Sequence, residues 1–218
     1  MVASLSAGCK KNLNNAAVNP NQPSTVTPNV LLTSSQATLG YVVGGDLSRF
    51  EGLLDQQTID GVSSRQFNVY ASYIFSTTDF DNTWVNLYTA MYNFQDLRVS
   101  AISKNYNAYA GIAYVMEAAT AGYTTDVWGD IPFSQALTGS TNLQPKVDAQ
   151  KNVYASIQSM LDSGIARLGA ANPGNLVPGS DDLVYGGNLA QWTRLAYSLK
   201  SRYYLHLRKV DNLSLIHI

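Results

Sequence analysis

Two carboxylates lie four residues apart within residues 125–137, which read Thr-Asp-Val-Trp-Gly-Asp-Ile-Pro-Phe-Ser-Gln-Ala-Leu. Asp126 and Asp130 could form the acid pair of a glycoside hydrolase, which needs two carboxyl groups flanking the scissile bond. In a second, structural interpretation, Asp126 bonds to backbone at a helix end and Asp130 caps the turn that follows. We favour the structural interpretation, because the same run carries several signals that end a helix.

Other catalytic chemistry has few candidates in this chain. The single cysteine, Cys9, rules out an intrachain disulfide and a cysteine-based metal cluster. The only histidines are His206, which we expect at a surface or interface, and His217 at the extreme end. The Asp-x-x-x-Asp spacing also lacks the alternating oxygen ligands of a calcium loop. We therefore expect no metal, no cofactor and no catalytic residue.

The helix-ending signals lie at the centre of the 125–137 run. Gly129 can adopt a left-handed conformation that closes a helix, and Pro132 follows where no helix can continue. Trp128 and Phe133 are expected to pack helices together rather than to form a platform for a sugar. Residues 134–137 are interpreted as a short helical turn. The run is thus predicted to be a structural junction with the key residues Asp126, Trp128, Gly129, Asp130 and Pro132.

Apolar residues recur at helical spacing in five segments, 29–57, 79–103, 106–125, 148–168 and 188–209. Gly44 and Gly45 interrupt the first segment, which suggests a kink or a close approach to another backbone. The many Ala and Gly residues of 106–125 would let a neighbouring helix come close. The last four segments pair as two hairpins. This pattern predicts an all-α fold of tetratricopeptide-like helical hairpins with long irregular loops.

Residues 58–78 combine aromatic and polar side chains without a clear helical period, which is typical of an irregular loop. Its 63–75 part offers donors, amides and flat aromatic faces of the kind that sugar rings require. Ordinary packing of the loop remains an equal alternative. The candidate ligand-binding residues are Arg65, Asn68, Tyr70, Tyr73 and Phe75.

Both ends of the chain differ from its middle. Small residues directly before Cys9 resemble the cleavage box of a bacterial lipoprotein signal peptide, so residues 1–9 are predicted to be a clipped signal peptide with its lipid attachment site. Residues 10–28 are rich in Asn and Pro and are predicted to form a flexible tether. The folded domain is expected over 29–210. Residues 211–218 look like an artefactual tail, so we assign no function to His217.

The composition narrows the range of ligands. Net charge is −1 over 218 residues, which gives no reason to expect nucleic acid as a partner. Charged residues make up 13% of the chain, about half the usual fraction near 25%, and there are 14 tyrosines. A surface rich in neutral polar residues and Tyr suits neutral hydrogen-bonding ligands such as sugars, or a protein partner.

Several pieces resemble, in the same order, the SusD/RagB-type outer-membrane lipoproteins of Bacteroidetes. They are the Cys9 anchor, the Asn-Pro-Asn-Gln-Pro tether from Asn19, the Gly-Gly-Asp-Leu-Ser-Arg turn at 44–49, the 119–137 run around Trp-Gly-Asp-Ile-Pro, and the 192–202 helix. The Gly-Gly-Asp-Leu element is most similar to the SusD-like branch. Compared with that family, the chain lacks roughly the C-terminal half.

The resemblance implies an α-rich, lipid-anchored protein on the outer membrane at the cell surface. Such a protein would capture an oligosaccharide or other nutrient and cap a SusC-like TonB-dependent transporter, without catalysis. Sugar-contacting residues vary within the family, so the resemblance assigns none here. Two alternatives stay open: a tetratricopeptide-like scaffold that binds only protein partners, and an α-helical glycosidase.

Overall fold

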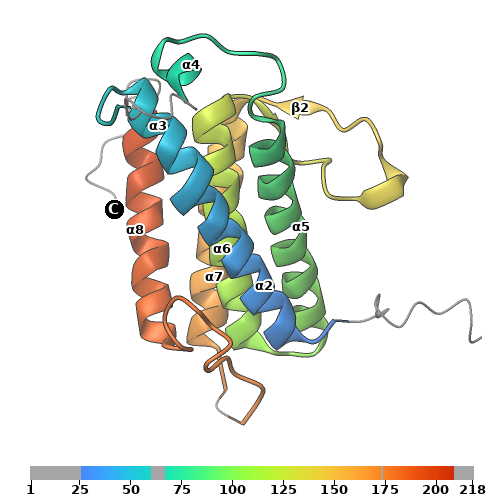
Figure 1. Cartoon of the computed structure of the whole chain (residues 1–218). Coiled ribbons are helices and arrows are strands. Elements are labelled where there is room, and N and C mark those ends of the chain that lie inside the picture. The colour runs from blue at the N-terminus through green and yellow to red at the C-terminus, as the bar shows by residue number, and fades with distance from the viewer. Residues whose placement is uncertain (1–25, 60–66, 173, 209–218) are drawn as a thin grey trace, which may run out of the picture.

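The computed structural model describes residues 26–59, 67–172 and 174–208, and these are mostly helical (Figure 1). The helices are α2 (Pro28–Tyr41), the π-helix η1 (Val42–Leu47), α3 (Ser48–Leu54), α4 (Asn68–Ala71), α5 (Asp81–Ser103), α6 (Asn107–Trp128), the 3₁₀ turn η2 (Gly139–Thr141), α7 (Gln150–Gly169) and α8 (Leu189–Leu207). Two short strands, β1 (Ile131–Pro132) and β2 (Val147–Asp148), pair antiparallel. The predicted all-α class is confirmed. Among the described residues, no helix has the length and apolarity needed to cross a membrane.

Helix α6 is the centre of the bundle and packs against α5, α7 and α8. Its glycines are the points of closest approach. A Cβ at Gly122 would lie 1.9 Å from the Tyr203 hydroxyl oxygen of α8, and a Cβ at Gly111 would lie 2.7 Å from Leu168 Cγ of α7. The expectation that small residues in this helix admit close neighbours is confirmed. The helix pairs α5–α6 and α7–α8 form the two predicted hairpins (Figure 1).

Helix α2 lies across α5 and α6 and runs on into η1 and α3 (Figure 1). Gly44 and Gly45 lie in η1, where the chain winds more loosely than in an α-helix. Nothing lies within 4 Å of a Cβ placed at either glycine, so the suggested close approach to another backbone is wrong. The interruption expected from the two glycines is instead a local change of helical winding.

The buried carboxylate of Asp182 ties the loop between α7 and α8 to the bundle. Trp192 Nε1 of α8 donates to Asp182 Oδ2 (2.7 Å), and Gln36 Nε2 of α2 donates to Asp182 Oδ1 (2.9 Å). Burial would raise the pKa of the Asp182 carboxyl, but these bonds and others from backbone N–H groups hold the pKa below its ordinary value. Gly187 completes the turn with a φ of +81°, and a Cβ there would lie 2.1 Å from the Pro178 carbonyl oxygen.

Candidate ligand-binding site

The two carboxylates of the 125–137 run are engaged by different helices. Asp126 Oδ1 accepts a hydrogen bond from the Tyr154 hydroxyl of α7 (2.5 Å) and lies 2.9 Å from His206 Nδ1 of α8. Arg202 Nη2 lies 3.7 Å from Asp126 Oδ2. The expected bond from Asp126 to backbone is therefore not what the structure shows, since side chains of two neighbouring helices bind it instead. Burial, reinforced by the bond to Asp126, raises the pKa of the Tyr154 hydroxyl.

Asp130 acts as a helix cap from outside the helix. Its Oδ1 accepts from the backbone N–H of Gln150 (2.8 Å), the first residue of α7. The N-cap position itself is Ala149, which has no side-chain acceptor. Asp130 thus caps α7, 20 residues further on, rather than the turn directly after it.

The junction itself closes α6 at Gly129, which has a φ of 72° and donates to the Thr125 carbonyl (2.8 Å). Trp128 packs edge-on against Trp84 of α5, with ring centroids 5.2 Å apart. The carbonyl of Pro132 in β1 accepts from the Tyr88 hydroxyl (2.7 Å). These contacts fasten the end of α6 to α5.

The predicted helical turn at 134–137 is wrong. The segment forms a single reverse turn, in which the Ala136 N–H donates to the Phe133 carbonyl (3.1 Å), and Leu137 has a φ of 62°. Asp148 of β2 explains why no helical turn forms. Its carboxylate accepts hydrogen bonds from the Ser134 N–H (2.6 Å) and from the Ser134 hydroxyl (2.9 Å). Burial would raise the pKa of the Asp148 carboxyl, but these bonds, together with those from Lys146 and Phe133, lower it.

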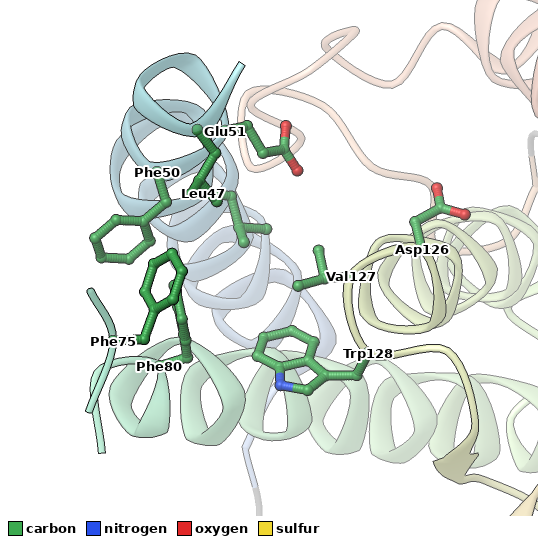
Figure 2. Close-up of a pocket in the computed structure, with 9 residues that line it drawn as sticks. Leu47, Phe50, Glu51, Phe75, Phe80, Asp126, Val127 and Trp128 are labelled. Atoms are coloured by element: carbon green, nitrogen blue, oxygen red, sulfur yellow. The ribbon is translucent and has the colours of Figure 1, made fainter. Parts of the chain in front are cut away.

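A pocket of about 490 Å³ opens between α3, the segment before α5 and the C-terminal end of α6 (Figure 2). Aromatic and aliphatic side chains make up most of its wall, and the charged residues among them are the two carboxylates Glu51 and Asp126. The lining residues are Leu47, Phe50, Glu51, Leu54, Phe75, Phe80, Asp126, Val127 and Trp128. The junction residues Asp126 and Trp128 therefore also face a cavity, a second role that their structural interpretation did not include.

An aromatic cluster supports one side of this pocket. Phe50 packs edge-on against Tyr70 (ring centroids 4.8 Å) and Phe80 (5.1 Å), and Phe75 lies 5.8 Å from Phe80. Phe75 is still 44% exposed, so part of its ring is available to a ligand. The cluster fixes the position of Phe75 although the segment that carries it has no regular structure.

The predicted ligand-binding residues differ in their position relative to the pocket. Phe75 lines the pocket, whereas Tyr70 is half-buried in the cluster beside it. Tyr73 is 54% exposed and donates its hydroxyl to the carbonyl of Leu54 (2.6 Å), itself a pocket residue. Asn68 lies exposed on α4. Arg65 lies outside the described residues, as does Cys9.

Sequence reasoning missed the wall of the pocket that the end of η1 and α3 form. Leu47, Phe50 and Leu54 belong to the apolar pattern of the first helical segment, which predicts core packing and not a cavity. In this segment the sequence indicates a possible binding surface only at Glu51, an acidic residue directly beside the apolar stripe. Across the described residues, no three His, Cys, Asp or Glu side chains come together as a metal site would require.

Residues 20–215 match the model of a family described as SusD-like, starch-binding and associating with the outer membrane. Because this match spans most of the chain, the chain belongs to the SusD-like family, as the sequence pieces predicted. The family is one of non-enzymatic binding proteins that associate with the outer membrane. No curated relative matches the chain.

Solved structures share the fold. A SusD/RagB family protein from Bacteroides thetaiotaomicron is 24% identical with a TM-score of 0.77, covering 87% of this chain and 40% of that one. A SusD homologue from Bacteroides fragilis is 25% identical with a TM-score of 0.65 (86% and 37%). A chitin-binding SusD homologue from Flavobacterium johnsoniae is 21% identical with a TM-score of 0.65 (84% and 40%). The chain thus spans about 40% of the length of these relatives.

Proposed function

We propose that the chain captures an oligosaccharide or similar nutrient at the cell surface and delivers it to a SusC-like TonB-dependent transporter. The observation that carries the proposal is the pocket of about 490 Å³, whose aromatic wall is interrupted by two carboxylates. Membership of the family described as starch-binding supports it, as does the fold shared with a chitin-binding homologue. The lipid anchor at Cys9 and the tether at 10–28 belong to the same proposal and rest on the sequence.

The pocket chemistry suits a sugar for two reasons. A sugar ring presents apolar C–H faces that pack on aromatic rings, and the pocket offers Phe75 and Trp128 for such contacts. Sugar hydroxyls are hydrogen-bond donors, and carboxylates are acceptors. The Asp126 carboxylate is already held by Tyr154 and His206, so it loses little freedom when a ligand binds.

The experiment is isothermal titration calorimetry of the chain with maltohexaose, cellohexaose and chitohexaose. We expect at least one of them to bind, and Phe75→Ala to weaken that binding about fivefold, since loss of one aromatic contact costs on the order of 1 kcal/mol. Tyr197→Ala is the matched control, because Tyr197 is 54% exposed on α8, away from the pocket, and its loss should leave affinity unchanged.

Two results would count against the proposal. If none of a broad panel of saccharides bound while a protein partner was captured, the chain would be the tetratricopeptide-like scaffold considered above. If a saccharide bound equally well to wild type and to Phe75→Ala, binding would take place elsewhere on the surface. Delivery to a transporter is tested separately, by co-purification of the chain with a co-expressed SusC-like protein.

A further inference from the structure

The pocket has an uneven charge as well as an aromatic wall. Its charged lining residues, Glu51 on α3 and Asp126 at the end of α6, are both acidic, and no Lys, Arg or His is among the lining residues within the described ranges 26–59, 67–172 and 174–208. Figure 2 shows these two carboxylates on two sides of the pocket, with the aromatic residues Phe75, Phe80 and Trp128 nearby. From the described part of the chain, a ligand that enters therefore meets lining charges of negative sign.

The two carboxylates differ in how far they are neutralised. Asp126 lies close to two side chains of α8, the cationic Arg202 (Nη2 at 3.7 Å) and the His206 imidazole (Nδ1 at 2.9 Å). Glu51 has no ion pair with any residue in the part of the chain that the structure describes. The nearest basic residue in sequence, Arg49, pairs with Asp46 (3.3 Å) and lies over the Phe67 ring. The charge that a ligand feels is therefore mainly that of Glu51.

On the basis of the proposed function, we infer that this pocket selects among saccharides by charge: it accepts neutral and amino sugars and excludes uronic acids and other anionic saccharides. An anionic group brought within several ångströms of Glu51 is repelled by like charge, and because Glu51 is exposed this repulsion is moderate and depends on salt. A protonated amine in the same place is attracted. Neutral hydroxyls donate to either carboxylate without a Coulomb penalty.

The test compares saccharides that share one backbone and differ in charge. The probes are maltohexaose and cellohexaose, each unmodified and oxidised at C6 to uronic acids, and the hexamer of glucosamine. We expect the oxidised form of the preferred backbone to bind on the order of fivefold or more weakly than the neutral form at low salt. This ratio should shrink as salt is added, because both charges lie near solvent.

Glu51→Gln removes the charge and keeps the shape of the side chain. We expect it to bring the neutral-to-oxidised affinity ratio close to one, and this ratio, not the affinity for either form alone, is the quantity that tests Glu51. Asp162→Asn is the matched control, because it removes one negative charge from an α7 side chain that is 63% exposed and does not line the pocket. Its ratio should equal that of wild type. Thermal unfolding of both variants verifies that they are folded.

The outcomes separate this inference from the proposed function. If the neutral forms bind but the oxidised forms bind equally or more tightly, the charge selection is wrong and saccharide capture stands. If Glu51→Gln leaves the ratio at the wild-type value, Glu51 is not the determinant and the inference is likewise overturned. If no saccharide of any charge binds, both the charge selection and the proposed function fail.

Discussion

At the scale of single residues, the Asp182 carboxylate is the point where three parts of the chain meet. It accepts from Gln36 of α2, from Trp192 of α8 and from the Gly187 N–H (2.8 Å) of its own loop. The residue is 3% exposed, so water cannot replace the carboxylate for these donors. A single loop residue thus stabilises the packing of helices at opposite ends of the described chain.

We expect Asp182→Ala to lower the free energy of unfolding by about 3–5 kcal/mol, because it leaves several buried donors without an acceptor. Urea unfolding followed by circular dichroism measures the change. Asp162→Ala serves as the control, since its side chain is 63% exposed and pairs only with Lys200 at the surface. That change should cost less than about 0.5 kcal/mol. A similar small cost for Asp182→Ala would contradict the role assigned to this carboxylate.

The same carboxylate gives stability a defined pH dependence. Its folded-state pKa lies below the ordinary value of 3.8, so its contribution is fully present above that value and is lost as the pH falls through the lower folded pKa. We expect the wild-type unfolding free energy to drop below about pH 4, and to drop less steeply in Asp182→Ala. Asp148 is unchanged in both proteins and supplies the remaining slope. Identical slopes would show that Asp182 has the same pKa in the folded and unfolded states.

The role of Asp182 could not be predicted, because its sequence neighbourhood shows only a loop rich in Gly, Pro, Asn and Asp. One of its partners lies 146 positions away along the chain. The 125–137 run was easier to interpret, since its helix-ending signals are local. The partners of Asp126 and Asp130 were nevertheless missed, because they belong to α7 and α8. Of the four candidate ligand residues that the structure describes, Phe75 alone is among those found to line the pocket.

At the scale of helices and strands, local periodicity predicted most of the fold. The segments expected at 79–103, 106–125, 148–168 and 188–209 correspond to α5–α8 with ends that differ by a few residues. The β1–β2 pair was not predicted, because two-residue strands leave no alternating pattern. The π-helical winding of η1 was not predicted either, since two adjacent glycines indicate an interruption of the helix but not its form.

Substitution of a glycine in α6 tests how closely this helix packs against α8. Gly122→Ala would place a Cβ 1.9 Å from the Tyr203 hydroxyl oxygen, so we expect it to destabilise the fold by about 1–3 kcal/mol. Gly40→Ala in α2 is the matched control, because a Cβ there has nothing within 4 Å. It should instead stabilise by about 0.5–1 kcal/mol through the higher helix propensity of Ala. Thermal or urea unfolding measures both changes, and equal effects would exclude a close α6–α8 contact.

At the scale of the whole molecule, burial is concentrated around α6, which packs against α5 of its own hairpin and against α7 and α8 of the other, while α4 has no buried residue. In hydrogen-exchange mass spectrometry we therefore expect the α6 amides to exchange slowest and those of α4 fastest. If added maltohexaose or cellohexaose slowed exchange in α4 and the segment that carries Phe75, that would support ligand binding in the pocket. Equal protection of α4 and α6 would contradict the arrangement described here.

The bond between Gln36 and Asp182 also bears on the order in which the chain becomes native. Helix α2 emerges from the ribosome before the other helices described. The acceptor of its Gln36 amide is Asp182, which is translated 146 residues later. Helix α2 can pack on α5 and α6 once these are made, but this bond can close only after residue 182 has been synthesised. Contacts between residues far apart in sequence form slowly, so among the described helices the first to be made is also one whose contacts are completed late.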